Sequence, residues 1–194
     1  MSNVLILGAN GQIARVATEL FLETTDALLT LSLRNSKRLR GLEPSRTRII
    51  EGDVLDEKKL GEAMVGQDVV YANLSGQLER QARSIAKAMH AAGIKRLIFV
   101  SSMGIYDEAP GEKYGSILDP YRKSAAIIEA SDLDYTLVRP AWLNDRDEID
   151  YETTRKSEPF KSSVVSRKSV ADLVVKLAQS RRMAVRDSLG VSKP

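Results

Sequence analysis

Two glycines three residues apart follow the first hydrophobic run of the chain, in the segment LILGANGQIAR (5–15). Gly8 suits a sharp turn and Gly11 suits a close approach of the backbone to a ligand, because neither carries a Cβ. A helix that begins directly after such a turn offers unpaired N–H groups and the positive end of its dipole to an anion. The segment therefore predicts a phosphate-binding loop, although a purely structural turn would also account for two glycines.

The spacing of these residues departs from the usual dinucleotide fingerprint, G-x-G-x-x-G, and is G-x-x-G-x-x-A at positions 8, 11 and 14. Ala14 is small enough to let the helix pack closely against a sheet. The context is more specific than the glycines, because the motif follows a predicted strand, precedes a predicted helix and begins a series of such units.

Basic residues occupy the position where NAD-binding proteins carry an acidic one. An Asp or Glu about 20 residues past the glycines usually holds the ribose 2′-OH of NAD. Here the segment is LSLRNSKRLR (31–40), with Arg34 at the strand end and Lys37 and Arg38 close behind. A guanidinium can pair with a 2′-phosphate, so the segment predicts that NADP(H) is preferred over NAD(H). A solvated basic turn is the alternative.

The composition excludes several other kinds of chemistry. The 194 residues include no cysteine and one histidine, His90, in an alanine-rich segment, so we expect no metal site. A net charge of +3 with 5% aromatic residues falls short of a nucleic-acid binder. No apolar segment approaches the roughly 20 residues that cross a bilayer, and the N-terminus has no signal-peptide pattern. We therefore expect a cytoplasmic protein with neither a nucleic-acid nor a membrane partner.

Short apolar runs alternate with amphipathic segments along the chain. The predicted strands are 3–8, 27–34, 48–53, 68–74, 96–102 and 135–140, and the predicted helices are about 12–23, 56–65, 77–92, 119–131 and 168–180. Strands that are apolar on both faces and separated by helices indicate a parallel sheet covered on both sides. We predict one domain over residues 1–194, an α/β doubly wound parallel sheet (Rossmann) in a three-layer α/β/α arrangement with strand order 3-2-1-4-5-6. A short last strand at 188–192 is expected to add an edge.

Several segments together resemble the atypical short-chain dehydrogenase/reductase proteins with an NmrA-like NAD(P)-binding domain. The matching segments are GANGQIA (8–14), LRNSKRL (33–39), EGDVLD (51–56), GQDVVYANLSG (66–76), IKRLIFVSS (94–102) and LDYTLVRPAWL (133–143). In length and order the chain is also similar to the small biliverdin-IXβ/flavin reductases. The resemblance implies the fold, whereas its members include reductases, epimerase relatives and redox-sensing regulators.

The resemblance also implies which residues contact the cofactor. Asp53 and Val54 would contact the adenine, although Asp53 could equally be a turn residue before the next helix. The residues expected along the rest of the cofactor are Gly8, Asn10, Gly11, Gln12, Ile13 and Arg34 at the phosphates, Asn73, Leu74, Ser75 and Gly76 at the middle, and Ser101, Ser102, Pro140, Ala141 and Trp142 at the nicotinamide.

The usual catalytic pair of the wider superfamily, Tyr-x-x-x-Lys, is absent from the sequence. The residues four positions after the six tyrosines are Ser75, Pro110, Leu118, Ala125, Arg139 and Arg155. Hydride transfer to an electron-poor ring can proceed without this pair, with protons from water. Ser102, Tyr106 and Tyr121 are the candidates for a substitute acid–base group. We expect a reductase of a small planar acceptor, flavin- or quinone-like. A regulator that senses NAD(P)H without turnover and an epimerase- or dehydratase-related enzyme are the alternatives.

The segment 143–160 is highly charged and is expected to be a solvated loop, although its carboxylates would also suit acid–base chemistry. Trp142, which precedes it, is placed either to wall a planar substrate or to fill the core. The final helix packs on the sheet or serves a dimer, so we expect a monomer or a homodimer.

Overall fold

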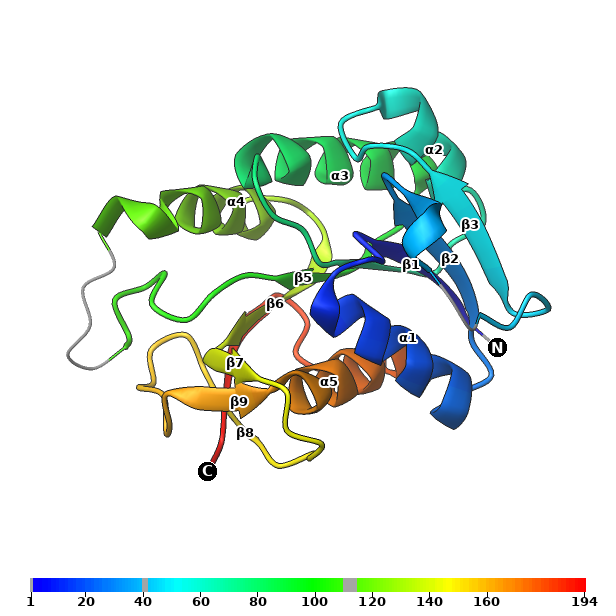
Figure 1. Cartoon of the computed structure of the whole chain (residues 1–194). Coiled ribbons are helices and arrows are strands. Elements are labelled where there is room, and N and C mark those ends of the chain that lie inside the picture. Colours follow the sequence, from blue (N-terminus) through cyan, green and yellow to red (C-terminus); the bar gives the residue numbers. More distant parts are fainter. Residues whose placement is uncertain (1, 40–41, 110–114) are drawn as a thin grey trace.

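The structure is a computed structural model that describes residues 2–39, 42–109 and 115–194 (Figure 1). An eight-stranded sheet of order β3-β2-β1-β4-β5-β6-β10-β8 forms its centre. Every neighbouring pair in that sheet is parallel except β10 with β8. The strands are β1 Asn3–Leu7, β2 Leu28–Leu33, β3 Thr47–Glu51, β4 Val69–Ala72, β5 Arg96–Val100, β6 Asp134–Pro140, β8 Glu152–Thr154 and β10 Asp187–Ser192.

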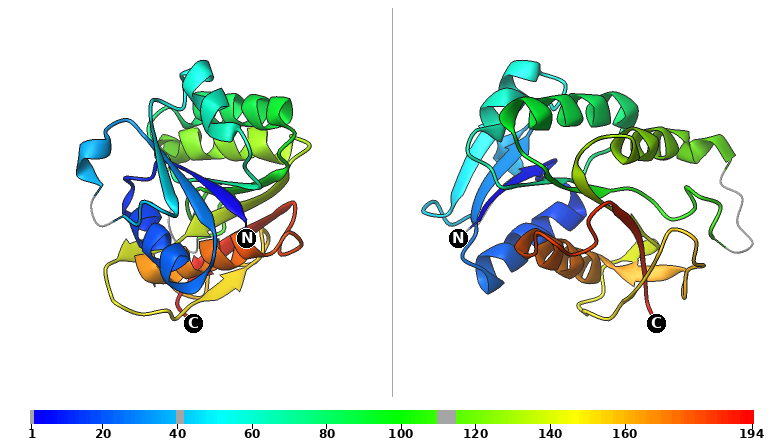
Figure 2. Two further views of the ribbon diagram at one scale, coloured as in Figure 1. Left: turned by 90° about the vertical axis from the view of Figure 1, so that its right-hand side faces the viewer. Right: turned by 180° about the vertical axis from the view of Figure 1, so that it is seen from behind.

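Helices cover both faces of this sheet (Figures 1 and 2). α1 (Gln12–Thr24) and α5 (Arg167–Gln179) pack together on one face. The other face carries α2 (Glu57–Met64), α3 (Leu78–Ala92) and α4 (Asp119–Glu129). The predicted α/β doubly wound Rossmann fold with three layers is therefore confirmed, and each predicted helix lies within about two residues of its observed range.

Alternation of side chains along the strands explains the two cores. In β1, Val4 and Ile6 pack with the apolar residues of α1 and α5. Leu5 and Leu7 point to the opposite face and pack with those of α2, α3 and α4. Because successive side chains of a strand point to opposite faces, a strand covered on both sides must be apolar throughout, as β1 is.

The carboxyl-terminal part of the sheet differs from the prediction. β10 was expected at the edge, but it lies between β6 and β8, so that β8 is the edge strand. β8 pairs antiparallel with β10, Thr154 opposite Gly190. A second, two-stranded sheet joins β7 (Trp142–Asn144) to β9 (Val164–Ser166).

The charged segment 143–160 is fastened by ion pairs as well as by these short strands. Asp145 pairs with Arg167 at 2.8 Å, and Lys193 contacts Glu148 at 3.1 Å and Asp150 at 3.3 Å. Its carboxylates therefore neutralise neighbouring cations. The expected solvated loop is wrong at β7 and β8, which pair with β9 and β10.

Membrane-spanning and metal-binding features were also sought in the described residues. None of the helices there combines the length and apolar character that a bilayer span needs. No cluster of three or more His, Cys, Asp or Glu side chains is arranged there to hold a metal ion.

Candidate functional site

The loop between β1 and α1 turns sharply at Gly8, whose φ is +77°. The N–H groups of Gly8 and Ala9 both donate to the Ser32 carbonyl of β2, at 2.9 and 3.1 Å. A Cβ added to Gly8 would lie 2.2 Å from the Asn73 carbonyl oxygen. Glycine is required here by both its backbone conformation and the close approach of β4.

Gly11 meets the side chain of the same neighbour. Its Cβ would lie 2.2 Å from Asn73 Nδ2, so the space beside Gly11 is filled by the Asn73 carboxamide. This differs from the expected reason, which was room for a ligand. Gly11 is also the N-cap of α1 and provides no side-chain cap, which leaves the first-turn N–H groups of α1 for another acceptor.

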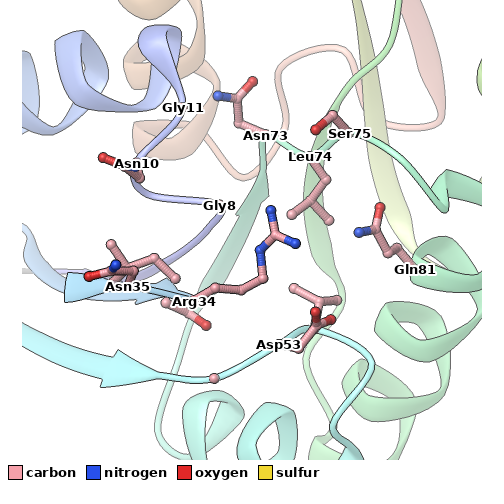
Figure 3. A pocket seen from close by; sticks show the side chains of 14 residues that line it. Gly8, Asn10, Gly11, Arg34, Asn35, Asp53, Asn73, Leu74, Ser75 and Gln81 are labelled. Carbon is pink, nitrogen blue, oxygen red and sulfur yellow. The ribbon is translucent and has the colours of Figure 1, made fainter. Parts of the chain in front are cut away.

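A cavity of about 560 Å³, here called the loop cavity, opens beside this turn (Figure 3). It lies past the carboxyl ends of β1, β2, β3 and β4, where ligands of doubly wound sheets bind. Its lining includes nine of the predicted residues, Gly8, Asn10, Gly11, Arg34, Asp53, Val54, Asn73, Leu74 and Ser75. Sequence reasoning missed five others, Ser32, Leu33, Asn35, Gly52 and Gln81.

Arg34 and Asp53 are the charged residues in this lining. Figure 3 shows the Arg34 side chain extending from the end of β2 across the cavity toward Leu74. Among the described residues, Arg34 has no hydrogen-bond or ion-pair partner. Asp53 lines the cavity, and its Oδ1 also accepts a hydrogen bond from Leu55 N at 2.8 Å, as expected of a residue in the turn before α2.

The basic turn after Arg34 is anchored to the neighbouring strand. Ser36 donates to Glu51 Oε2 from its hydroxyl at 2.6 Å and from its N–H at 3.1 Å. These two bonds lower the pKa of Glu51 below its ordinary value. The turn therefore has a fixed attachment to β3, which the sequence did not suggest because Glu51 lies 15 positions from Ser36.

A second cavity of about 530 Å³, here called the Trp142 cavity, shares Asn73 and Leu74 with the loop cavity. The other predicted residues in its lining are Ile13, Ser101, Ser102, Tyr121, Pro140, Ala141 and Trp142. Val100, Met103, Ile117, Leu118, Leu143 and Arg167 complete the lining and were not foreseen. Most of the predicted cofactor-binding residues thus line one of two cavities, which share Asn73 and Leu74.

The Trp142 cavity combines an apolar wall with a few hydroxyl groups. Ile117, Trp142 and Leu143 are large apolar side chains that are 73%, 58% and 36% exposed. Ser101 Oγ is buried and has no hydrogen-bond partner among the described residues. The Tyr121 side chain, from α4, is partly buried at the same cavity. A ligand with a flat apolar body and a polar edge suits this combination.

Three predicted residues are not among the described residues that line either cavity. Gln12 is exposed at the first position of α1, and Gly76 is exposed with a φ of +84°. The Tyr106 hydroxyl donates to Glu129 Oε1 at 2.7 Å, and its ring lies 5.1 Å from the Arg139 guanidinium. Burial raises the pKa of Tyr106.

Comparison with known proteins agrees with the fold. Residues 8–181 match the model of a family described as NAD(P)H-binding. A Rossmann-fold NAD(P)-binding family protein from Shigella flexneri is 45% identical with a TM-score of 0.91, and the match covers 100% of this chain and 94% of that one.

Two further relatives are less similar in sequence. A short-chain dehydrogenase/reductase from Veillonella parvula, solved in complex with NADP, is 29% identical with a TM-score of 0.90, over 100% of this chain and 95% of that one. YhfK of Bacillus subtilis, described as an uncharacterized sugar epimerase, is 28% identical over 89% of this chain and 86% of its own length.

Proposed function

Since the chain belongs to the NAD(P)H-binding family and has the fold of its oxidoreductases, we propose that it is an NADP(H)-dependent reductase of a small planar acceptor. The loop cavity would hold the adenosine phosphate part of NADP(H), and the Trp142 cavity would hold the nicotinamide together with the acceptor. The meeting of the two cavities at Asn73 and Leu74 supports this assignment.

Three observations fit a bound dinucleotide. The turn at Gly8 and Gly11 leaves the uncapped start of α1 beside the loop cavity, which suits a pyrophosphate. Arg34 has no partner among the described residues and suits a 2′-phosphate. Ser101 Oγ is a buried hydroxyl that still lacks an acceptor or donor in the described structure, and it lies where the nicotinamide is expected.

The preference for the phosphorylated cofactor rests on Arg34. No acidic residue follows it in the segment 35–42, and Asp53 is the one acidic residue among the described lining of the loop cavity. A charge-assisted hydrogen bond contributes roughly 1.5–3 kcal/mol, which corresponds to about a tenfold to hundredfold preference for NADP(H). The Veillonella parvula protein was solved with NADP, which supports the same preference.

The apolar wall of the Trp142 cavity is the observation from which we infer the acceptor and the type of reaction. Bound NADPH supplies a hydride. Ile117, Trp142 and Leu143 would hold a flat ring against the site and exclude water from it. The hydroxyls of Tyr121 and Ser102 are the chain's groups that can hold a proton at the acceptor edge.

The acceptor should be one whose reduction does not depend on a strong, fixed acid. Residue 125, four positions after Tyr121, is alanine, and Lys123 lies 3.8 Å from Glu79 in an ion pair. Tyr121 therefore acts without the lysine that the superfamily usually places beside its tyrosine. Electron-poor flavin- or quinone-like rings meet this condition, because they accept a hydride readily and take protons from water.

A calorimetric titration with NADPH and NADH tests the cofactor part of the proposal. We expect NADPH to bind more tightly, and Arg34→Gln to weaken NADPH by about tenfold to a hundredfold while NADH is unchanged. Arg48→Gln is the matched control, because Arg48 is an exposed arginine of β3 that does not line the loop cavity. Equal binding of both cofactors by the unaltered protein would refute the role of Arg34.

An acceptor screen with flavins and quinones, monitored by loss of NADPH absorbance, tests the reaction. Turnover that falls in Tyr121→Phe while NADPH affinity is kept would support a proton role for Tyr121. Tight NADPH binding without turnover of any acceptor would instead favour a regulatory protein that senses NADP(H).

An epimerase is the second candidate, favoured by the similarity to YhfK. Sugar substrates require several polar partners, whereas exposed apolar side chains form much of the wall of the Trp142 cavity. Product analysis after incubation with nucleotide sugars and NADP⁺ distinguishes this candidate, because an epimerase converts its substrate without net change in the cofactor.

A further inference from the structure

Arg167, the first residue of α5, brings a positive charge to the Trp142 cavity. It is the one charged residue among the described lining of that cavity, and no carboxylate contributes to the lining. Its side chain is 17% exposed, so the guanidinium lies mostly out of solvent. A positive charge in this lining favours a negatively charged ligand beside Trp142.

The guanidinium is incompletely partnered. Nη1 donates to Asp145 Oδ1 at 2.8 Å, and the Asp145 side chain is 85% exposed. Nε is buried and has no hydrogen-bond partner among the described residues. A buried donor that has lost water and found no acceptor is unfavourable, and an arginine fork normally holds a planar pair of oxygens with two donors.

The end of α5 adds to this positive potential. Ser166 is the N-cap and accepts from Ser169 N, so the cap is filled, but the positive end of the helix dipole still coincides with Arg167. The dipole therefore adds to the positive charge of Arg167.

We propose that the acceptor carries an anionic substituent, a carboxylate or a phosphate, which Arg167 binds while the flat part of the molecule lies against Trp142. This inference rests on the proposed function, because it assigns the Trp142 cavity to the acceptor. The exposed Asp145 then acts as a competing carboxylate that the substituent displaces from Arg167.

Trp142 is the single tryptophan of the chain, so its fluorescence reports binding at this cavity directly. The protein is saturated with NADP⁺ and titrated with 2-naphthoate and with its neutral analogue 2-naphthamide, by calorimetry with Trp142 emission as the check on location. We expect naphthoate to bind about tenfold or more tightly than naphthamide.

Arg167→Gln should remove this difference by weakening naphthoate alone, and NADPH affinity should stay the same. Lys168→Gln is the matched control, because Lys168 is the next residue of α5, pairs with Asp147, and does not line the Trp142 cavity. This control should keep the full preference for naphthoate.

Asp145→Asn gives a test in the opposite direction, at a side chain that is 85% exposed. Removal of the competing carboxylate should tighten naphthoate binding severalfold and leave naphthamide unchanged. Equal binding of the two probes by the unaltered protein would overturn the inference. So would an Arg167→Gln protein that loses NADPH affinity along with naphthoate, since Arg167 would then belong to the cofactor. Failure of NADPH to bind the unaltered protein would instead refute the proposed function itself.

Discussion

Asn73 leaves no room for a Cβ at Gly8 or at Gly11, through a different atom in each case. Gly8 faces the backbone carbonyl of Asn73 and has a φ of +77°, whereas Gly11 faces the Asn73 side-chain amide in an ordinary extended conformation. A backbone carbonyl cannot move without displacing β4, but a carboxamide can be removed by mutation. The two glycines can therefore be separated experimentally.

Gly8→Ala should destabilise the protein by about 2–4 kcal/mol, because it adds backbone strain to a steric clash. Gly11→Ala should cost about 1–3 kcal/mol through the clash alone. In an Asn73→Ala background, Gly11→Ala should lose most of its cost and Gly8→Ala should keep it. Denaturant unfolding of the single and double variants measures the coupling of Asn73 to Gly8 and its coupling to Gly11. Equal costs of Gly11→Ala in the two backgrounds would contradict this assignment.

At the scale of elements, Glu108 holds the loop after β5 to β6. Its Oε1 bonds to Arg139 and accepts from Gly104 N at 3.1 Å, and its Oε2 accepts from Tyr106 N at 2.8 Å. The side chains of Arg139 and Glu108 are 0% and 4% exposed. This loop begins at residues that line the Trp142 cavity, so the buried pair positions one wall of the site.

Glu108→Ala should lower the free energy of unfolding by about 3–5 kcal/mol, because it leaves the Arg139 charge buried without its carboxylate. Lys87→Ala is the contrasting variant, since the Lys87–Glu57 pair is 71% and 74% exposed and should contribute less than about 1 kcal/mol. Chemical denaturation of both variants measures the two losses in the free energy of unfolding. A cost for Glu108→Ala as small as that for Lys87→Ala would show that the pair does not hold the loop.

Tyr151 attaches the charged segment 143–160 to α5 and makes the stability of the fold depend on pH. Its hydroxyl donates to Asp172 Oδ2 at 2.8 Å, and burial together with this bond raises the pKa of Tyr151 to about 12. A raised pKa means that the folded state favours the protonated hydroxyl. The stabilising contribution is thus complete below the ordinary value of 10.0 and is lost as the pH rises through about 12.

The difference in unfolding free energy between the unaltered protein and Tyr151→Phe should accordingly be constant from neutral pH to about pH 10 and should shrink between about pH 10 and 12. Urea unfolding across this range measures it, and comparison with the phenylalanine variant cancels the other tyrosines. A difference that does not change with pH would place Tyr151 in solvent.

Local sequence patterns predicted the helices and strands whose formation depends on neighbouring residues. The six main strands and five helices follow from apolar runs, caps and glycines, and the glycine loop follows from its position between β1 and α1. β7, β8 and β9 have three residues each and gain their partners from distant positions, as Trp142 does from Val164. No spacing rule indicates such pairs.

The same limit applies to the site. Gln81 lines the loop cavity and Arg167 lines the Trp142 cavity. They come from α3 and α5, which pack on opposite faces of the sheet, so only the tertiary packing brings them to the site. Neither residue belongs to a recognisable motif, so the sequence alone did not distinguish them from other helix-surface residues. Tyr106 shows the converse, since its place after β5 suggested a catalytic role while its hydroxyl bonds to Glu129.

At the scale of the whole molecule, one sheet carries both cavities. Residues of the lining come from Gly8 near the start of the chain to Arg167 in α5, and β10 near the end of the chain pairs with β6. Helices α1 and α5 pack together although they lie far apart in the sequence. The two halves of the chain therefore contribute to the same core among the described residues, and one domain over residues 1–194 stays a prediction.

The chain should accordingly unfold in a single cooperative transition, with Trp142 emission and far-ultraviolet circular dichroism giving the same midpoint. NADPH at about one hundred times its Kd should add about 2.7 kcal/mol of stability, which for a chain of this size raises the Tm by about 5–10 °C. NADH at the same concentration should raise it less, because Arg34 discriminates between the two. Because Trp142 lies in the carboxyl-terminal half, a Trp142 transition that stayed in place while the circular dichroism transition moved would mean that NADPH stabilises only part of the chain. Such a result would divide the protein into two units and contradict a site built across one sheet.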